Sequence, residues 1–211
     1  MKIQPFTLSS GYTNTYAVSY GKDVYIIDAP DSIAPLIAYI EREGLDPKGV
    51  ILTHGHFDHI LGLGELRRAF PDLPIYISHD DICFLEDGGK LNKEILSGFG
   101  RMDREIELLN DLPDDLSVLE DDIWKFRVIR TPGHTPGSIC LYSAEDNVLF
   151  SGDTLFRRSI GRTDFGGSYP AILESLDKIS SSIKEDTLVL PGHGDITTIK
   201  DEKKYNPYLR K

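Results

Sequence analysis

The feature of this 211-residue chain that most constrains its fold is a set of histidines and aspartates that directly follow predicted strands. The segment 53–59 comes at the end of the short apolar run 49–53, and the other members follow strands further along the chain. The set comprises His54, His56, Asp58, His59, His134, Asp153 and His193. Functional sites are usually built on loops held by a rigid sheet. We therefore expect a fold in which distant strand ends converge on one site.

The spacing within residues 53–59 suits metal binding. His54 and His56 are separated by one residue, so their side chains point the same way in an extended backbone. Gly55 between them lets the backbone approach a metal ion closely. Asp58 and His59 follow as the chain turns and can face a neighbouring position. One short loop can therefore serve a pair of metal ions.

Imidazole and carboxylate ligands without thiolate suit zinc, iron or manganese. Any single histidine is more often a hydrogen-bonded core or surface residue than a ligand. Of the 6 histidines, however, only His79 lies outside the set. We interpret His79 as structural and the other five as ligands.

The composition is that of a globular protein, with 40% hydrophobic and 27% charged residues. The length fits one domain, residues 1–211. The formal net charge of -11 repels phosphate backbones, so we expect no nucleic-acid partner. An anionic small substrate remains possible, because divalent cations reverse the local field.

The sequence shows no targeting or membrane signal. No stretch approaches the ~20 apolar residues of a membrane helix, and the first residues show no signal-peptide pattern. Cys83 and Cys140 lie far apart, and we expect reduced thiols in a cytoplasmic protein with no membrane partner. We interpret Cys140 as a core residue.

Hydrophobic patterning predicts strands and helices in both halves of the chain. Two sheets packed face to face, with helices outside both, satisfy this pattern. Asp31 and Ser32 are predicted to cap the first helix and Gly44 to end it. Residues 79–122, which mix helical and glycine-rich stretches, are interpreted as a cover element. The predicted strands are 6–8, 15–20, 24–28, 49–53, 75–77, 124–130, 138–142, 148–150 and 187–190, and the predicted helices are 33–43, 64–70, 169–183 and a short one near the C-terminus.

Four segments resemble the motifs of one enzyme superfamily. Residues 53–59 resemble the T-H-x-H-x-D-H signature of the metallo-β-lactamase superfamily, and residues 131–138, 151–156 and 191–194 resemble its later motifs in the right order. The match spans nearly the whole chain. Within the superfamily the chain is most similar to the short form of the glyoxalase II-like (hydroxyacylglutathione hydrolase-like) group, which residues 161–165 and 203–209 also fit.

The resemblance implies an α/β fold, a four-layer αββα sandwich, with the site at one edge. It further implies a pair of divalent metal ions, for which we expect zinc, with iron or manganese as alternatives. The first metal would be held by His54, His56 and His134, the second by Asp58, His59 and His193, and Asp153 would bridge both.

The resemblance also implies hydrolysis of a small-molecule thioester such as S-lactoylglutathione. A hydroxide shared by the metals would attack the carbonyl, and Asp58 could orient it as well as bind metal. The thiolate leaving group has a pKa of about 8.5, so no strong general acid is needed.

The chain departs from the group at the glutathione site. It ends before the C-terminal helical domain of full-length glyoxalase II. Arg162 stands where the group has a lysine, Asp164 replaces a tyrosine, and residues 194–195 replace another tyrosine. We expect Arg162 to bind substrate; the alternatives are a solvated basic run with Arg157 and Arg158, or pairing with Asp164.

Other residues are candidates for supporting roles. Asp28 and Thr135 could orient histidines by hydrogen bonds, and Asp28 could equally be a simple turn residue. Tyr12 and Asn14, on the first hairpin, could line the mouth of the site.

Two rival functions remain open. A persulfide dioxygenase would hold a single iron through His54, His134 and Asp153 on the same fold. A non-catalytic interaction protein would tolerate gaps in the ligand set, and the sequence contains none. A β-lactamase, lactonase or nuclease fits less well, and the sequence leaves the oligomeric state open.

Overall fold

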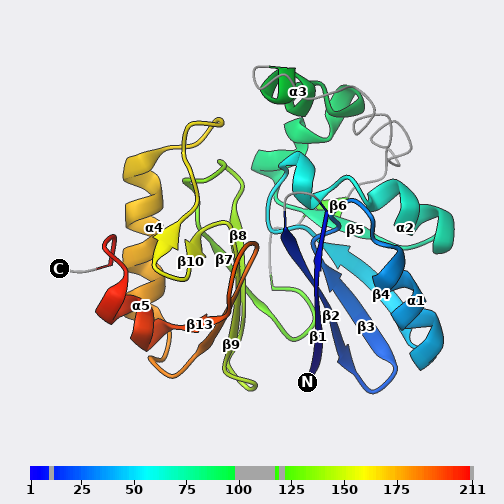
Figure 1. Ribbon diagram of the computed structural model, residues 1–211, viewed down its shortest axis with the longest axis horizontal. Coiled ribbons are helices and arrows are strands. Elements are labelled where there is room, and N and C mark those ends of the chain that lie inside the picture. Colours follow the sequence, from blue (N-terminus) through cyan, green and yellow to red (C-terminus); the bar gives the residue numbers. More distant parts are fainter. Residues whose placement is uncertain (10–11, 98–116, 119–121, 210–211) are drawn as a thin grey trace. The chain divides into compact units, whose positions relative to one another are not determined.

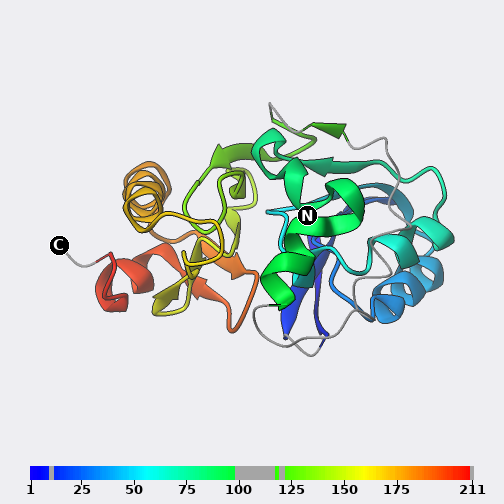
Figure 2. The same ribbon diagram turned by 90° about the horizontal axis from the view of Figure 1, so that it is seen from above.

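The computed structural model of the chain describes residues 1–9, 12–97, 117–118 and 122–209. It contains two compact units, Met1–Val118 and Leu119–Lys211. Figures 1 and 2 colour the first unit from blue to green and the second from green to red. Among the described residues, no helix is long and apolar enough to cross a membrane.

The N-terminal unit is built on a six-stranded sheet in which the strands follow their sequence order. The first three strands form the predicted antiparallel meander, and the next three are added in parallel. Parallel strands need crossover connections, which here carry helices. The strands are β1 (Lys2–Leu8), β2 (Thr13–Tyr20), β3 (Asp23–Ile27), β4 (Asp46–Ile51), β5 (Ile75–Ile77) and β6 (Ser117–Val118).

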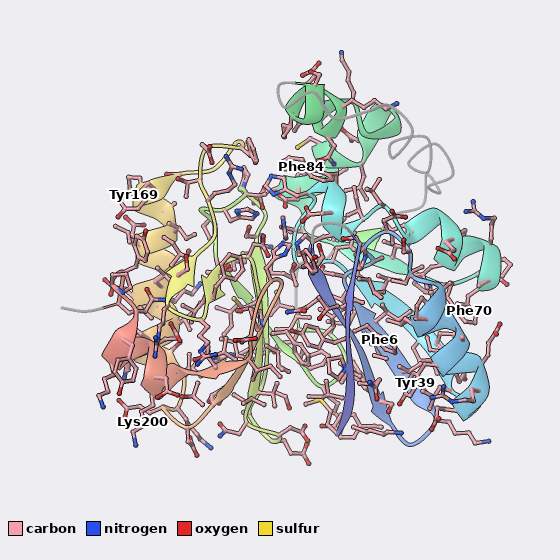
Figure 3. All side chains as sticks on the ribbon, in the orientation of Figure 1. Phe6, Tyr39, Phe70, Phe84, Tyr169 and Lys200 are labelled. Carbon is pink, nitrogen blue, oxygen red and sulfur yellow. The ribbon has the colours of Figure 1, made fainter. Side chains whose placement is uncertain are left out.

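Helices α1 (Ala34–Glu43) and α2 (Leu63–Ala69) lie along one face of this sheet (Figure 1). Leu36 and Ile40, on one face of α1, are fully buried in the core with sheet residues such as Ile26. Tyr39 of α1 packs edge-on against Phe6 of β1, with ring centroids 5.8 Å apart (Figure 3).

The two ends of α1 differ in how well the sequence predicted them. Gly44 ends the helix as expected, because its φ of 61° is the left-handed conformation that glycine adopts without strain. The predicted cap by Asp31 and Ser32 is wrong. The N-cap is Ile33, with no side-chain cap, and Asp31 instead accepts a hydrogen bond from the Ser32 amide. Pro35 in the first turn has no N–H, so fewer donors there need a cap.

Residues 79–122 are described only in part. A 3-10 helix, η2 (His79–Phe84), leads into α3 (Glu86–Ser97), and both belong to the N-terminal unit rather than to a unit of their own. The acidic clusters at 114–115 and 120–121, and the glycines at 98 and 100, lie outside the described residues.

The C-terminal unit contains a five-stranded sheet in the order β13-β12-β9-β8-β7 and a separate hairpin, β10-β11. The parallel strands β9 and β12 are joined through α4 (Tyr169–Ser182), which lies along one face of the sheet (Figure 1). A short helix, α5 (Ile199–Tyr205), follows near the C-terminus, as predicted. The strands are β7 (Arg127–Arg130), β8 (Ile139–Ser143), β9 (Val148–Gly152), β10 (Leu155–Phe156), β11 (Ser159–Ile160), β12 (Leu188–Pro191) and β13 (Thr197–Thr198).

Leu176 and Ile179 of α4 are buried with Leu149 and Val189 of the sheet. These side chains belong to the hydrophobic core of this unit. Tyr169, the first residue of α4, is half-exposed (Figure 3). The strand expected from residue 124 is too long at its start. Trp124 has a φ of 54°, so the chain turns there and the ladder begins only at Arg127.

Candidate metal centre

The N-terminal unit gathers four candidate ligands on one loop. The chain leaves β4 and turns through a single 3-10 turn, η1 (Phe57–His59). The ring centroid of His54 lies 4.9 Å from that of His56 and 4.2 Å from that of His59. All three imidazoles are buried, and an oxygen of the half-buried Asp58 lies 3.8 Å from Nε2 of His59.

Hydrogen bonds fix which nitrogen these rings present. Nδ1 of His59 lies 2.9 Å from Oδ2 of Asp28, and Nδ1 of His54 lies 3.1 Å from Oγ1 of Thr53. Asp28 also accepts from the amide and the hydroxyl of Thr53, at 2.7 and 2.8 Å. A metal would therefore take Nε2 of both rings, and Asp28 orients His59 while also shaping the end of β3.

Three residues that the sequence did not single out hold this loop. Thr13 donates from its hydroxyl to Oδ2 of Asp58 at 3.3 Å. Oδ2 of Asp81, a fully buried carboxylate, accepts from the Gly55 amide at 2.9 Å. Asn92 of α3 bonds the backbone of the loop at Gly55 and Phe57. These partners lie 26 to 45 residues away along the chain, so no local pattern signals them.

Gly55 has a packing role besides the one expected from the sequence. A Cβ at this position would lie 2.6 Å from Cβ of Phe84, which is closer than real Cβ atoms approach. The ring of Phe84 also packs edge-on against His56, with centroids 5.1 Å apart. Phe84 therefore requires glycine here and helps to orient the second histidine of the loop.

The C-terminal unit carries the other three candidate ligands. Asp153 follows β9, His193 follows β12, and His134 lies in the turn between β7 and β8. Oδ2 of Asp153 lies 3.4 Å from Nε2 of His134 and 3.4 Å from Nε2 of His193. One carboxylate oxygen thus stands beside two imidazole nitrogens. His134 and Asp153 are buried, and the side chain of His193 is 26% exposed.

The orientation of His134 depends on a backbone carbonyl. Nδ1 of His134 lies 2.7 Å from the carbonyl oxygen of Arg162, which leaves Nε2 as the metal-binding nitrogen. The chain comes this close because residue 161 is glycine. A Cβ at Gly161 would lie 1.8 Å from the carbonyl oxygen of Asp153. Gly161 therefore allows one segment to pack against two candidate ligands.

The side chain of Arg162 is engaged within its own segment. Its Nε and Nη2 bond the two carboxylate oxygens of Asp164 at 2.6 and 2.5 Å, and its guanidinium lies 3.6 Å from the centroid of the Phe165 ring. The guanidinium lowers the pKa of Asp164 to about 2, so the pair stays charged at neutral pH. The structure thus shows the pairing that the sequence left as an alternative, and the substrate role of Arg162 stays a prediction.

The remaining candidates are placed as follows. Tyr12 is exposed, and Asn14 is buried and accepts from the hydroxyl of Thr7 at 2.8 Å; their place at a site mouth stays a prediction. The hydroxyl of Thr135 bonds that of Ser138 at 2.7 Å, which shapes the turn that carries His134. The side chain of His79 is exposed, and its structural interpretation stays a prediction.

Both cysteines are free thiols, as predicted. Cys140 lies in the core, where burial raises the pKa of its thiol to about 11. Cys83 is exposed.

The donors of each unit fit divalent metal ions. Five imidazoles, three of them anchored through Nδ1, together with carboxylates and no thiolate, are a ligand set that suits zinc, iron or manganese. The N-terminal unit would supply His54, His56, Asp58 and His59, and the C-terminal unit would supply His134, Asp153 and His193.

A comparison of the chain with models of known protein families shows the family to which it belongs. The model of the Metallo-beta-lactamase superfamily matches residues 9–193. The chain belongs to the metallo-β-lactamase superfamily. Members of this superfamily are generally metal-dependent hydrolases and typically bind two metal ions. The matched residues extend over both units of the chain.

Two curated relatives match most of the chain. The hydroxyacylglutathione hydrolase GloC of Haemophilus influenzae is 34% identical over 194 residues, which are 89% of this chain and 88% of the relative. The probable metallo-hydrolase YqgX of Bacillus subtilis is 34% identical over 201 residues, 93% of this chain and 92% of the relative.

Two solved structures confirm the predicted fold class. The B3 metallo-β-lactamase BLEG-1 has a TM-score of 0.84 and 35% identity, with all of both chains covered. The di-iron-bound form of TTHA1623 has a TM-score of 0.85 and 34% identity, with 98% of this chain and 100% of that chain covered. The α/β metallo-β-lactamase fold, predicted as an αββα sandwich, is therefore the fold of this chain.

Proposed function

We propose that this protein is a metal-dependent hydrolase of small-molecule thioesters. The observation that carries the proposal is the placement of Asp153, whose Oδ2 lies 3.4 Å from Nε2 of both His134 and His193. A carboxylate oxygen flanked by two imidazoles suits a bridge between two metal ions. The superfamily's typical two-metal site supports joining this set to the four ligands of the 53–59 loop.

Bound metal ions would supply Lewis acidity, which lowers the pKa of water towards neutrality and stabilises charge on the substrate carbonyl. The residues of the chain hold and orient the participants. Asp58 would accept a hydrogen bond from the attacking water, and Thr13, which donates to Asp58, limits how that carboxylate can turn. Asp28 and the carbonyl of Arg162 hold Nδ1 of His59 and His134, so that Nε2 of each ring would be the nitrogen that binds a metal ion.

The thioester class is supported by chemistry and by a relative. A thiolate with a pKa of about 8.5 leaves without protonation, so ligands and water suffice for the reaction. GloC, which covers most of this chain, is named as a hydroxyacylglutathione hydrolase. The substrate would be a small molecule, glutathione-linked or carried by another thiol. Zinc is the proposed metal, with iron and manganese as alternatives.

The test combines metal analysis with a thioester panel. Asp153→Ala is expected to lose bound metal, measured by elemental analysis, and at least ~100-fold of the turnover of S-lactoylglutathione and other thioesters. Asp177→Ala, which removes an exposed carboxylate of α4, is the matched control. It is expected to keep the bound metal and the thioester turnover of the wild type.

Two outcomes would contradict the proposal. One is near-normal thioester turnover by Asp153→Ala. The other is a wild-type protein that holds one iron and consumes oxygen with glutathione persulfide, which would assign the dioxygenase reaction instead.

A further inference from the structure

A hollow of about 410 Å³ lies beside His193 in the C-terminal unit. Its lining consists of Phe156, Arg157, His193, Gly194 and Asp195. The ring of Phe156 packs edge-on against His193, with centroids 5.9 Å apart, and supplies an apolar wall. Because His193 is a candidate metal ligand, a group bound in this hollow would lie next to the reacting centre.

The rim of the hollow carries an ion pair. Nη1 of Arg157 donates to Oδ2 of Asp195 at 2.7 Å. The two side chains are 50% and 76% exposed, so little desolvation opposes the pair and it remains open to solvent. The charge of Arg157 is therefore already matched by a carboxylate of the same chain.

Arg157 is presented from a turn that buried residues hold in place. Glu202 is buried, and its Oε2 accepts from the backbone amide of Arg158 at 2.7 Å. Asn206, also buried, donates to the carbonyl oxygen of Ser159 at 3.0 Å and to Glu202 at 2.8 Å. These bonds fix the β10–β11 turn, so the place of Arg157 at the rim is set by the fold.

The same compensation occurs at Arg162, the arginine that the sequence predicts to bind substrate. Arg162 is held by both oxygens of Asp164. Arg157 and Arg162 thus each pair with a carboxylate of the same chain, whose net charge is -11. At these two side chains, an approaching anion would meet the carboxylates of Asp195 and Asp164 rather than an uncompensated guanidinium.

From this we infer that Asp195 is a specificity-determining residue, which makes the hollow favour thioesters whose thiol carrier has no net negative charge. The inference rests on the proposed thioester function. An anionic carrier must compete with Asp195 for the hydrogen bonds of Arg157. The carboxylate of Asp195 also repels such a carrier. An uncharged carrier can pack on Phe156 without disturbing the pair.

The test compares two substrates that share one acyl group. S-lactoylglutathione carries an anionic thiol carrier, and S-lactoyl-N-acetylcysteamine carries an uncharged one. In Asp195→Asn the ratio of kcat/KM for the anionic over the uncharged thioester is expected to rise about three- to tenfold at low salt. The gain should shrink at ~0.5 M salt, where exposed charges are screened.

Glu185→Gln is the matched control. It removes the carboxylate of another exposed ion pair in the same unit, 2.9 Å from Lys203 and outside the hollow's lining. The substrate ratio of this variant is expected to stay within about 1.5-fold of the wild type. If Glu185→Gln shifted the substrate ratio as much as Asp195→Asn, the loss of any one negative charge would explain the shift. That result would overturn the inference.

A binding measurement separates this inference from the proposed function. S-methylglutathione and S-methyl-N-acetylcysteamine are thioethers, so their affinity for metal-loaded protein, measured by calorimetry, does not depend on hydrolysis. Asp195→Asn should bind S-methylglutathione about three- to tenfold more tightly relative to the uncharged thioether. An unchanged preference, or no binding of S-methylglutathione to either protein, overturns the inference. A shifted preference in a protein that hydrolyses no thioester would overturn only the proposed function.

Discussion

At the scale of single residues, Asp28 illustrates how a strand end becomes part of a metal site. Its φ of 61° is uncommon for a residue other than glycine, although aspartate is among those that tolerate it. The buried carboxylate then accepts from the amide of Thr53, the hydroxyl of Thr53 and the ring of His59. The turn role and the orienting role, which the sequence left as alternatives, coexist in one residue.

Asp28→Ala should weaken both metal binding and folding. Metal affinity is expected to fall about 10- to 100-fold, because His59 loses the acceptor that orients it. The free energy of unfolding should fall by about 1–3 kcal/mol, because buried donors lose their partner. Chelator competition and urea unfolding measure the two effects. Asp28→Asn, which keeps an acceptor, should recover part of both, and Asp31→Ala serves as control; equal metal affinity in all three variants would refute the orienting role.

At the scale of elements, α3 matters through one buried side chain. Asn92 is fully buried, and its Nδ2 donates to the carbonyl oxygens of Gly55 and Phe84, both at 2.9 Å. Its Oδ1 accepts from the amide of Phe57 at 3.1 Å. One amide group thus ties α3 and η2 to the loop that carries the candidate ligands.

Asn92→Ala is expected to lower the free energy of unfolding by about 1–3 kcal/mol, because two buried backbone groups and one part-buried group lose a partner. Metal affinity should fall with it, because the loop at residues 54–59 is less constrained. The comparison is with Glu94→Ala, an exposed position on the same helix, which should stay within ~0.5 kcal/mol of the wild type. Urea unfolding measures the stability of each variant, and chelator competition measures its metal affinity. If Asn92→Ala were as stable as Glu94→Ala, α3 would not support the loop.

At the scale of the whole molecule, the open question is how the two units cooperate. The family model extends over residues 9–193 and so includes parts of both units. The prediction of a single domain over residues 1–211 requires that the two units unfold together. A single cooperative domain unfolds in one step that all probes report alike.

Trp124 allows this to be measured, because it is the only tryptophan and belongs to the C-terminal unit. In metal-free protein, its fluorescence and the far-UV circular dichroism, which reports on both units, should give the same urea midpoint to within ~0.2 M. Two separate midpoints would show that the units unfold independently, and the single-domain prediction would then be wrong.

The sequence alone determined what is local. Period-two and helical patterning located the long strands and helices, and strand-end placement with motif spacing selected the seven candidate ligands before any contact was known. It missed β6, β10, β11 and β13, because strands of two residues leave no periodic signal. It also extended the strand at 124–130 too far, because the left-handed turn at Trp124 carries no glycine to mark it.

Only the tertiary structure decided the partners of those residues. Asn92 bonds the loop at residue 55 from 37 residues away, and Glu202 supports the turn at residue 158 from 44 residues away. The pairing of Arg157 with Asp195 spans 38 residues. The contacts of Asn92 and Glu202 form where packing brings buried donors and acceptors together, and the need to satisfy buried polar groups selects them. The exposed pair of Arg157 and Asp195 follows from where the fold places the β10–β11 turn. No pattern in the residue spacing indicates these contacts. The sequence therefore predicted the metal ligands but not the residues that hold and surround them.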